Sequence, residues 1–131
     1  MRAWLLGLAL LTACAKGMPA NDGGALVGTA WRLRTIGGEA VLADVEATLE
    51  FPEAGRVAGR GSCNRFFGTV RVDGDSVAFG GMGATRMACA EAVMRQEDAY
   101  LRALEAATRL RRDGGRLTLE GTGPALGLER R

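Results

Sequence analysis

The sequence predicts an α+β domain: a curved, mostly antiparallel sheet that forms an incomplete barrel, with one main helix packed against it. Short runs of alternating apolar and polar residues, the period of a half-buried strand, recur along the chain between glycine-rich turns. One stretch, residues 90–107, lacks glycine and proline and is rich in strong helix formers. Strands on both sides of a single helix are typical of this fold class.

Strands are predicted before the helix over residues 31–36, 47–51, 56–59, 67–72 and 76–79. The second of them stops at Pro52, and a tight turn leads into the third. The last two are joined across Asp73-Gly74, and an Asp-Gly pair between alternating runs is a strong hairpin signal. This part of the chain is therefore predicted to form antiparallel hairpins.

The predicted helix carries its apolar residues on one face. Those at helical spacing are Val93, Tyr100, Leu101, Leu104 and Ala107. Such a stripe is the ordinary signal of a helix that packs on a core, so we expect it to face the concave side of the sheet rather than a cofactor. Further strands are predicted over residues 109–112, 116–120 and 125–129.

The N-terminal segment, residues 1–13, resembles a lipoprotein signal peptide. Arg2 precedes an apolar run of residues 3–11, which is too short to span a bilayer and fits the core of an export signal. The following Leu-Thr-Ala-Cys resembles the lipobox of bacterial lipoproteins, in which the cysteine is acylated and becomes the first mature residue. The resemblance implies lipidation of Cys14. An ordinary signal peptide with an incidental Cys14 is the alternative.

Residues 14–25 are predicted to form a flexible tether, because they are small, polar or structure-breaking and show no periodicity. The folded domain is then expected over residues 26–131. The lipoprotein resemblance implies that the protein lies in the cell envelope and is attached to a membrane through the lipid. Ala15 follows the lipidated cysteine, where an aspartate retains many proteobacterial lipoproteins in the inner membrane. The resemblance therefore implies the outer membrane, facing the periplasm.

Composition excludes several classes of function. The chain has no histidine, which excludes Ser-His-Asp and Cys-His catalysis and removes the commonest transition-metal ligand. Charges of both signs are scattered, so no basic stripe predicts nucleic-acid binding. Carboxylates are paired at Asp73 and Asp75 and at Glu97 and Asp98, but turn chemistry and a solvated helix face explain them better than glycoside cleavage or calcium binding. We expect no enzyme, no metal site and no cofactor.

The cysteines fall into an anchor and a pair. If Cys14 carries the lipid, Cys63 and Cys89 remain. An exported chain reaches an oxidising compartment, where such a pair is expected to form a disulfide. Two free buried thiols are the alternative, since only proximity in the fold decides between them.

Two segments around this pair resemble the META domain family, also called HslJ-like, of small bacterial envelope proteins. The first is Gly-x-Cys-Asn at residues 61–64 with the following Phe67-Gly68, and the second is Thr-Arg-Met-Ala-Cys at residues 85–89. The opening Trp31-x-Leu33 and the helix with Glu97 fit as well. The family-motif residues are Trp31, Gly61, Cys63, Asn64, Gly68, Thr85, Met87 and Cys89. The family implies a curved, incompletely closed sheet with a helix against it, and it is linked to stress response.

We expect a non-enzymatic, membrane-anchored envelope lipoprotein that binds a partner or supports a stress response. The partner would be an envelope protein, or a hydrophobic ligand held between helix and sheet. The alternative is a periplasmic inhibitor of a lysozyme or protease. In that case the loops near Cys63 and Cys89 would insert into the target, with Arg60, Arg65 and Arg86 as contacts.

Overall fold

The computed structural model describes residues 23–131. Its strands are β1 (Ala30–Ile36), β2 (Glu39–Ala40), β3 (Thr48–Glu50), β4 (Arg56–Arg60), β5 (Arg65–Asp73), β6 (Ser76–Ala84), β7 (Ala107–Asp113), β8 (Arg116–Gly121) and β9 (Leu126–Arg130). Its helices are α1 (Gly23–Leu26) and α2 (Glu91–Ala106). Every predicted strand and the predicted helix are present, whereas α1 and β2 were not predicted. The signal peptide, residues 1–13, and Cys14 lie outside the described residues, and α1 begins inside the predicted tether.

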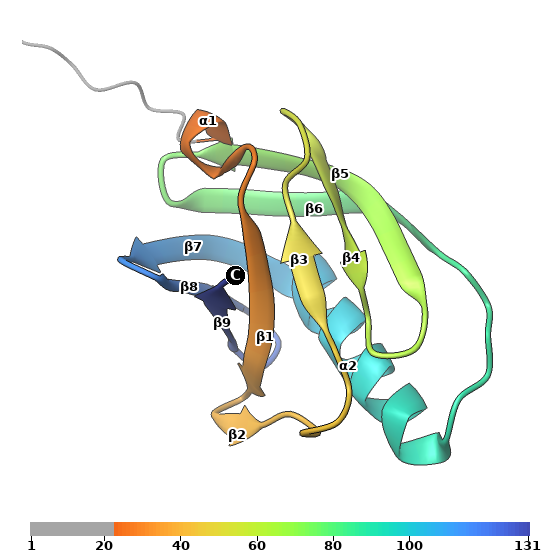
Figure 1. The fold of residues 1–131 in the computed structure, drawn as a ribbon. Coiled ribbons are helices and arrows are strands. Elements are labelled where there is room, and N and C mark those ends of the chain that lie inside the picture. The colour runs from red at the N-terminus through yellow and green to blue at the C-terminus, as the bar shows by residue number, and fades with distance from the viewer. Residues whose placement is uncertain (1–22) are drawn as a thin grey trace, which may run out of the picture.

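The strands close into a barrel (Figure 1). The sheet runs β2-β1-β3-β4-β5-β6-β7-β8-β9, and β9 pairs back onto β1 in antiparallel register, from Trp31 opposite Arg130 to Ile36 opposite Leu126. Only the two-residue β2 lies outside the ring. The predicted incomplete barrel of an α+β domain is therefore wrong, because the protein is a mostly β, closed barrel with one long helix. The barrel closes through the β1–β9 pairing, which joins the two ends of the domain. Alternation of apolar and polar residues within single strands does not predict such a pairing.

One seam of the barrel depends on side chains. Strands β3 and β4 share a single residue pair, Glu50 with Ala58. The Thr48 hydroxyl accepts a hydrogen bond from the backbone N–H of Arg60 at 3.0 Å, and the Tyr100 hydroxyl donates to the Thr48 carbonyl at 2.8 Å. Helix α2 therefore helps to hold this seam, which lies beside the motif segments.

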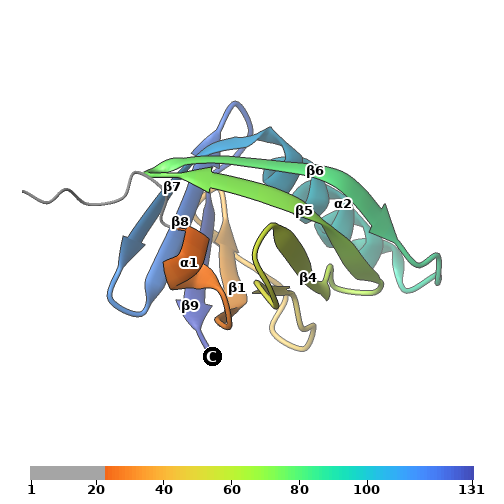
Figure 2. The same ribbon diagram turned by 90° about the horizontal axis from the view of Figure 1, so that it is seen from above.

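The predicted apolar face of α2 is buried against the barrel. Tyr100 and Leu104 are fully buried, and the Tyr100 ring meets the Phe66 ring edge-on at a centroid distance of 5.8 Å. Helix α1 lies on the opposite side of the barrel from α2 (Figure 2) and buries Leu26. Between the helices, leucine, valine and aromatic side chains from the strands fill the interior. Among residues 23–131, no helix has both the length and the apolar character needed to cross a membrane.

Candidate functional site

The two motif segments meet over α2. The first is the loop at residues 61–64 between β4 and β5, and the second is the extended segment at residues 85–90 between β6 and α2. A disulfide joins Cys63 to Cys89, whose Cα atoms are 6.0 Å apart. The predicted pairing is therefore confirmed, and the alternative of two free thiols is excluded for this structure.

The carboxylate of Glu97 holds the first segment. Only 6% of Glu97 is exposed. Its Oε1 accepts hydrogen bonds from the backbone N–H groups of Cys63 at 2.9 Å and Asn64 at 2.6 Å, and its Oε2 accepts one from Asn64 Nδ2 at 2.7 Å. The prediction of a solvated helix face is therefore wrong for Glu97. It holds for the neighbouring Asp98, which is exposed and pairs with Arg102 at 2.9 Å.

The side chain of Asn64 bridges to the second segment. Its Oδ1 accepts hydrogen bonds from the Thr85 hydroxyl at 3.0 Å and from the backbone N–H of Met87 at 2.5 Å. Its Nδ2 donates to the Met87 carbonyl at 3.1 Å as well as to Glu97. The amide thus has two donor and two acceptor contacts, which is the full hydrogen-bonding capacity of an asparagine side chain. The Asn64 side chain therefore hydrogen-bonds both the N–H and the carbonyl of residue 87, as the backbone of an adjacent strand would.

The turn at residues 61–64 fits tightly on α2. A Cβ at Gly61 would lie 2.9 Å from Glu97 Oε1, so any larger residue would collide with the carboxylate. Ser62 has φ of 136°, a conformation that costs a non-glycine residue about 1–3 kcal/mol. Its hydroxyl accepts a hydrogen bond from Gln96 Nε2 at 2.9 Å. Adjacent side chains of α2, Gln96 and Glu97, therefore fix a strained loop. Sequence reasoning missed the role of Gln96, for which we find no signal in its spacing.

Two predicted motif residues lie away from this network and belong to the barrel. Trp31 is fully buried, donates from Nε1 to the Thr29 hydroxyl at 2.8 Å, and lies beneath the guanidinium of Arg112 at 5.3 Å. Gly68 is also buried, and a Cβ there would lie 2.5 Å from Met82 Sδ. Both residues shape the core, whereas Gly61, Cys63, Asn64, Thr85, Met87 and Cys89 form one connected unit with Glu97.

A groove of about 380 Å³ lies beside this unit, on the outer face of β3, β4 and β5. We call it the Phe67 groove. Its lining residues are Glu46, Thr48, Glu50, Ala58, Gly59, Arg60, Arg65, Phe66, Phe67, Thr85 and Arg131. Phe67 is 57% exposed, and Met87, two residues after Thr85, is 53% exposed. Arg86, between Thr85 and Met87 in the sequence, is also exposed. The groove therefore presents the Phe67 ring and the guanidinium groups of Arg60 and Arg65, and the unit adjoins it through Thr85.

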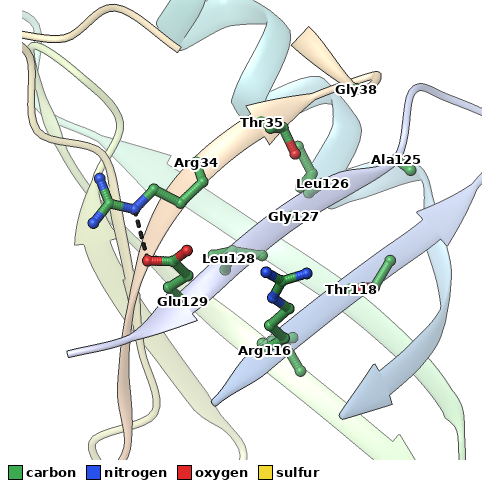
Figure 3. A pocket seen from close by; sticks show the side chains of 11 residues that line it. Arg34, Thr35, Gly38, Arg116, Thr118, Ala125, Leu126, Gly127, Leu128 and Glu129 are labelled. Carbon is green, nitrogen blue, oxygen red and sulfur yellow. Dashed lines mark hydrogen bonds and ion pairs between the residues drawn. The ribbon is translucent and has the colours of Figure 1, made fainter. Parts of the chain in front are cut away.

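A second groove, of about 370 Å³, crosses β1, β9 and β8 (Figure 3). The backbone of Gly127 lies in its floor, where a Cβ would lie 2.5 Å from the Thr35 hydroxyl. Arg34 at its edge pairs with Glu129 at 3.0 Å, shown by the dashed line. Because that guanidinium already has a carboxylate partner and the motif residues lie elsewhere, the Phe67 groove is the stronger candidate site.

The Phe67 groove presents guanidinium groups and a phenyl ring. The Glu97 carboxylate of the neighbouring unit is already engaged in three hydrogen bonds. Among the described residues, no three His, Cys, Asp or Glu side chains come together as they would at a metal site.

Taken together, fold and site define a class of small, closed, antiparallel barrel with one long helix, in which a disulfide and a buried glutamate hold two motif segments. The family model described as "META domain" matches residues 24–130. The chain belongs to the META domain family.

Solved structures support the fold. An NMR structure of a protein from Burkholderia xenovorans is similar at 25% identity with a TM-score of 0.67, covering 96% of this chain and 99% of that one. A second NMR structure is similar at 22% identity with a TM-score of 0.71, covering 82% of this chain and 93% of that one, and shows the fold alone. Nothing matches among curated proteins.

Proposed function

We propose that this META domain protein is a non-enzymatic, membrane-anchored envelope lipoprotein whose barrel binds a protein partner. The observation that carries the proposal is the exposure of Phe67 in a groove that also contains Arg60 and Arg65, next to the disulfide-linked unit. Aromatic residues, methionine and arginine are enriched at protein interfaces. A loop that is already ordered loses little conformational entropy on binding.

A protein partner fits the packing better than a hydrophobic ligand between helix and sheet. That space is filled by Tyr100, Ala103 and Leu104 of α2 against Phe66 of β5. A ligand there would have to displace core side chains, each of which stabilises the fold by about 1.5–3 kcal/mol through burial. The Phe67 groove, in contrast, is open to a partner without rearrangement.

The absence of an enzymatic role is part of the proposal. A hydrolytic site needs a nucleophile, a base and a group that stabilises developing charge, arranged around one point. The chain has no histidine, and the buried carboxylate at the site, Glu97, points its oxygens at the backbone of residues 63 and 64. Its hydrogen bonds support a structural role.

The anchor is proposed at Cys14, with the domain in the cell envelope, on the outer membrane and facing the periplasm. Two or more acyl chains give stable membrane attachment, whereas one acyl chain holds a protein only marginally. In the Cys14→Ala precursor, metabolic labelling with a fatty acid and membrane association should both be lost. The Cys63–Cys89 bridge should still form. Labelling that persists in this variant contradicts the anchor.

The protein partner is tested by crosslinking in intact cells. A photoreactive amino acid at position 67 should form adducts with protein, identified by mass spectrometry. The same amino acid at Arg71, exposed on the same strand but outside the groove, is the matched control. Adducts from position 67 that contain only lipid, or adducts that are the same from both positions, contradict a protein partner at this groove.

An inhibitor of a lysozyme or protease is a second candidate function. It is favoured by the disulfide-stapled loop at residues 61–64, because inhibitory loops need a rigid conformation, and by the nearby cations Arg65 and Arg86. The purified protein should then slow at least one enzyme in a panel of lysozymes and proteases. Lack of inhibition across the panel excludes this function for the enzymes tested.

A further inference from the structure

We infer that the Phe67 groove binds an acidic segment of the partner protein, in which carboxylates on either side of an apolar side chain pair with Arg60 and Arg65. This inference rests on the proposed function, since it names the chemistry of the protein partner. Three independent features of the groove carry it: its charge, its aromatic surface and its shape.

The cations at one edge of the groove have no acidic partner within the described residues. The ion pairs found between residues 23 and 131 include none that uses Arg60 or Arg65. The Arg60 guanidinium donates to the Cys63 carbonyl, an uncharged acceptor, at 3.4 Å. An arginine matches a carboxylate with two parallel hydrogen bonds, so this edge is suited to carboxylates from outside the domain.

The opposite edge of the groove is acidic but already neutralised. Glu46 pairs with Arg32 and with Arg131, both at 3.5 Å, and Glu50 lies 3.9 Å from Arg131. The carboxylates of a bound segment would therefore turn away from this edge and toward Arg60 and Arg65. Such a separation of charge gives the segment one orientation in the groove.

The ring of Phe67 is fixed as an apolar platform. A Cβ at Gly83 would lie 2.9 Å from the ring, so one part of the ring rests on the backbone of β6 while the side chain stays 57% exposed. A fixed aromatic side chain buries much area for little lost entropy. The Phe67 ring therefore suits an apolar residue of the segment.

The shape of the groove favours a protein segment over an anionic membrane. A bilayer surface also supplies negative charge and apolar chains, but it cannot enter a concave groove of about 380 Å³ that has Ala58 and Gly59 among its lining residues. Glu46 and Glu50 in the same groove would also lie against the anionic headgroups. A projecting apolar side chain whose flanking carboxylates both turn toward Arg60 and Arg65 satisfies both edges.

Selection from a random peptide library displayed on phage tests the inference, with the full-length protein as bait. Peptides enriched on the wild type should carry an apolar residue flanked by Asp or Glu. Their binding should weaken with added salt, because exposed charge pairs are screened. Arg65→Glu combined with Arg60→Glu should weaken an enriched peptide by about tenfold or more, which corresponds to about 1.4 kcal/mol. Arg71→Glu, the matched control, should leave it unchanged.

Several results overturn the inference. One is an enriched pool without an excess of acidic residues, and another is no enrichment at all. A third is equal loss of binding in the Arg60–Arg65 variant and in Arg71→Glu. Co-sedimentation with phosphatidylglycerol vesicles that depends on Arg65, without acidic peptides in the pool, would assign the groove to a membrane instead.

The crosslinking experiment separates this inference from the proposed function. Protein adducts from position 67 that persist in the Arg60→Glu, Arg65→Glu protein would retain the protein partner and overturn its acidic chemistry. Loss of those adducts in the double variant, with adducts retained in Arg71→Glu, supports both. Absence of protein adducts even in the otherwise wild-type protein defeats the proposed function itself.

Discussion

Glu97 binds Asn64 at two points: Oε1 accepts the backbone N–H at 2.6 Å, and Oε2 accepts the side-chain Nδ2 at 2.7 Å. The helix therefore fixes both the backbone and the rotamer of Asn64. Asn64 in turn holds Met87 through both its N–H and its carbonyl. The position of the exposed Met87 thus depends on a buried carboxylate.

Replacing Glu97 with glutamine should destabilise the protein by about 2 kcal/mol, because hydrogen bonds to a charged group each contribute about 1.5–3 kcal/mol. A glutamine oxygen can still accept the two backbone N–H groups, but its NH₂ then faces the NH₂ of Asn64, so two donors oppose each other. Urea unfolding measures the loss. Asp98→Asn, which removes an exposed helix pair, should change the stability by about 0.5 kcal/mol or less. Equal effects of the two substitutions would contradict the role of Glu97.

Gly61→Ala should destabilise the protein by about 1–3 kcal/mol, the usual effect of overpacking a tight site. The added Cβ would lie 2.9 Å from Glu97 Oε1 and 3.0 Å from its Cγ. The carboxylate cannot retreat without breaking its hydrogen bonds to residues 63 and 64. Thermal unfolding compares it with Gly115→Ala, where the nearest atom is 3.9 Å away, at Arg130 Cβ. A loss in Gly115→Ala as large as in Gly61→Ala would show that crowding against Glu97 is not the cause.

The local elements of this fold could be predicted from the sequence, because each strand alternates and each turn has its own glycine or proline. Closure of the barrel could not, since it depends on Trp31 lying opposite Arg130, near the other end of the chain. The two smallest elements could not be predicted either. Strand β2 has only two residues, too few to show a period. Helix α1 is a single turn that starts with Gly23-Gly24, two poor helix formers, although it buries Leu26.

The candidate site was half predictable. Export and the cysteine count predict the Cys63–Cys89 disulfide but leave two free thiols as the alternative, and the motif residues came from the family resemblance. Glu97 was misjudged as solvated although a signal was present: it lies four residues after Val93 and seven before Leu104, within the apolar stripe. A carboxylate on such a stripe is buried and therefore needs donors. What no spacing shows is that the donors come from residues 63 and 64.

Removing the disulfide should loosen the site while the barrel stays folded. For Cys63→Ser with Cys89→Ser we expect a loss of about 3–4 kcal/mol, the loop-entropy value for cysteines 26 residues apart. The bridge holds residue 89 onto residue 63, so local opening without it should make hydrogen exchange accelerate most at residues 85–90 and less between β1 and β9. The wild type under reducing agent is the control and should show the same pattern. Uniform acceleration over all strands would mean that the bridge supports the whole barrel rather than the site.

Tyr100 should make the stability fall at alkaline pH. Burial raises the pKa of its hydroxyl well above the usual value of 10.0. The unfolded chain therefore releases this proton above about pH 10 while the folded protein keeps it, so stability is complete below that pH and declines above it by about 1.4 kcal/mol per pH unit.

Tyr100→Phe should lose about 1 kcal/mol at neutral pH, with the hydrogen bond to Thr48, but should lack this part of the alkaline decline. Urea unfolding at a series of pH values measures the difference between the two proteins, and since the chain has one tyrosine, tyrosinate absorbance follows the same group directly. A tyrosine that titrates near pH 10 in the folded protein would contradict the burial of Tyr100 at the β3–β4 seam.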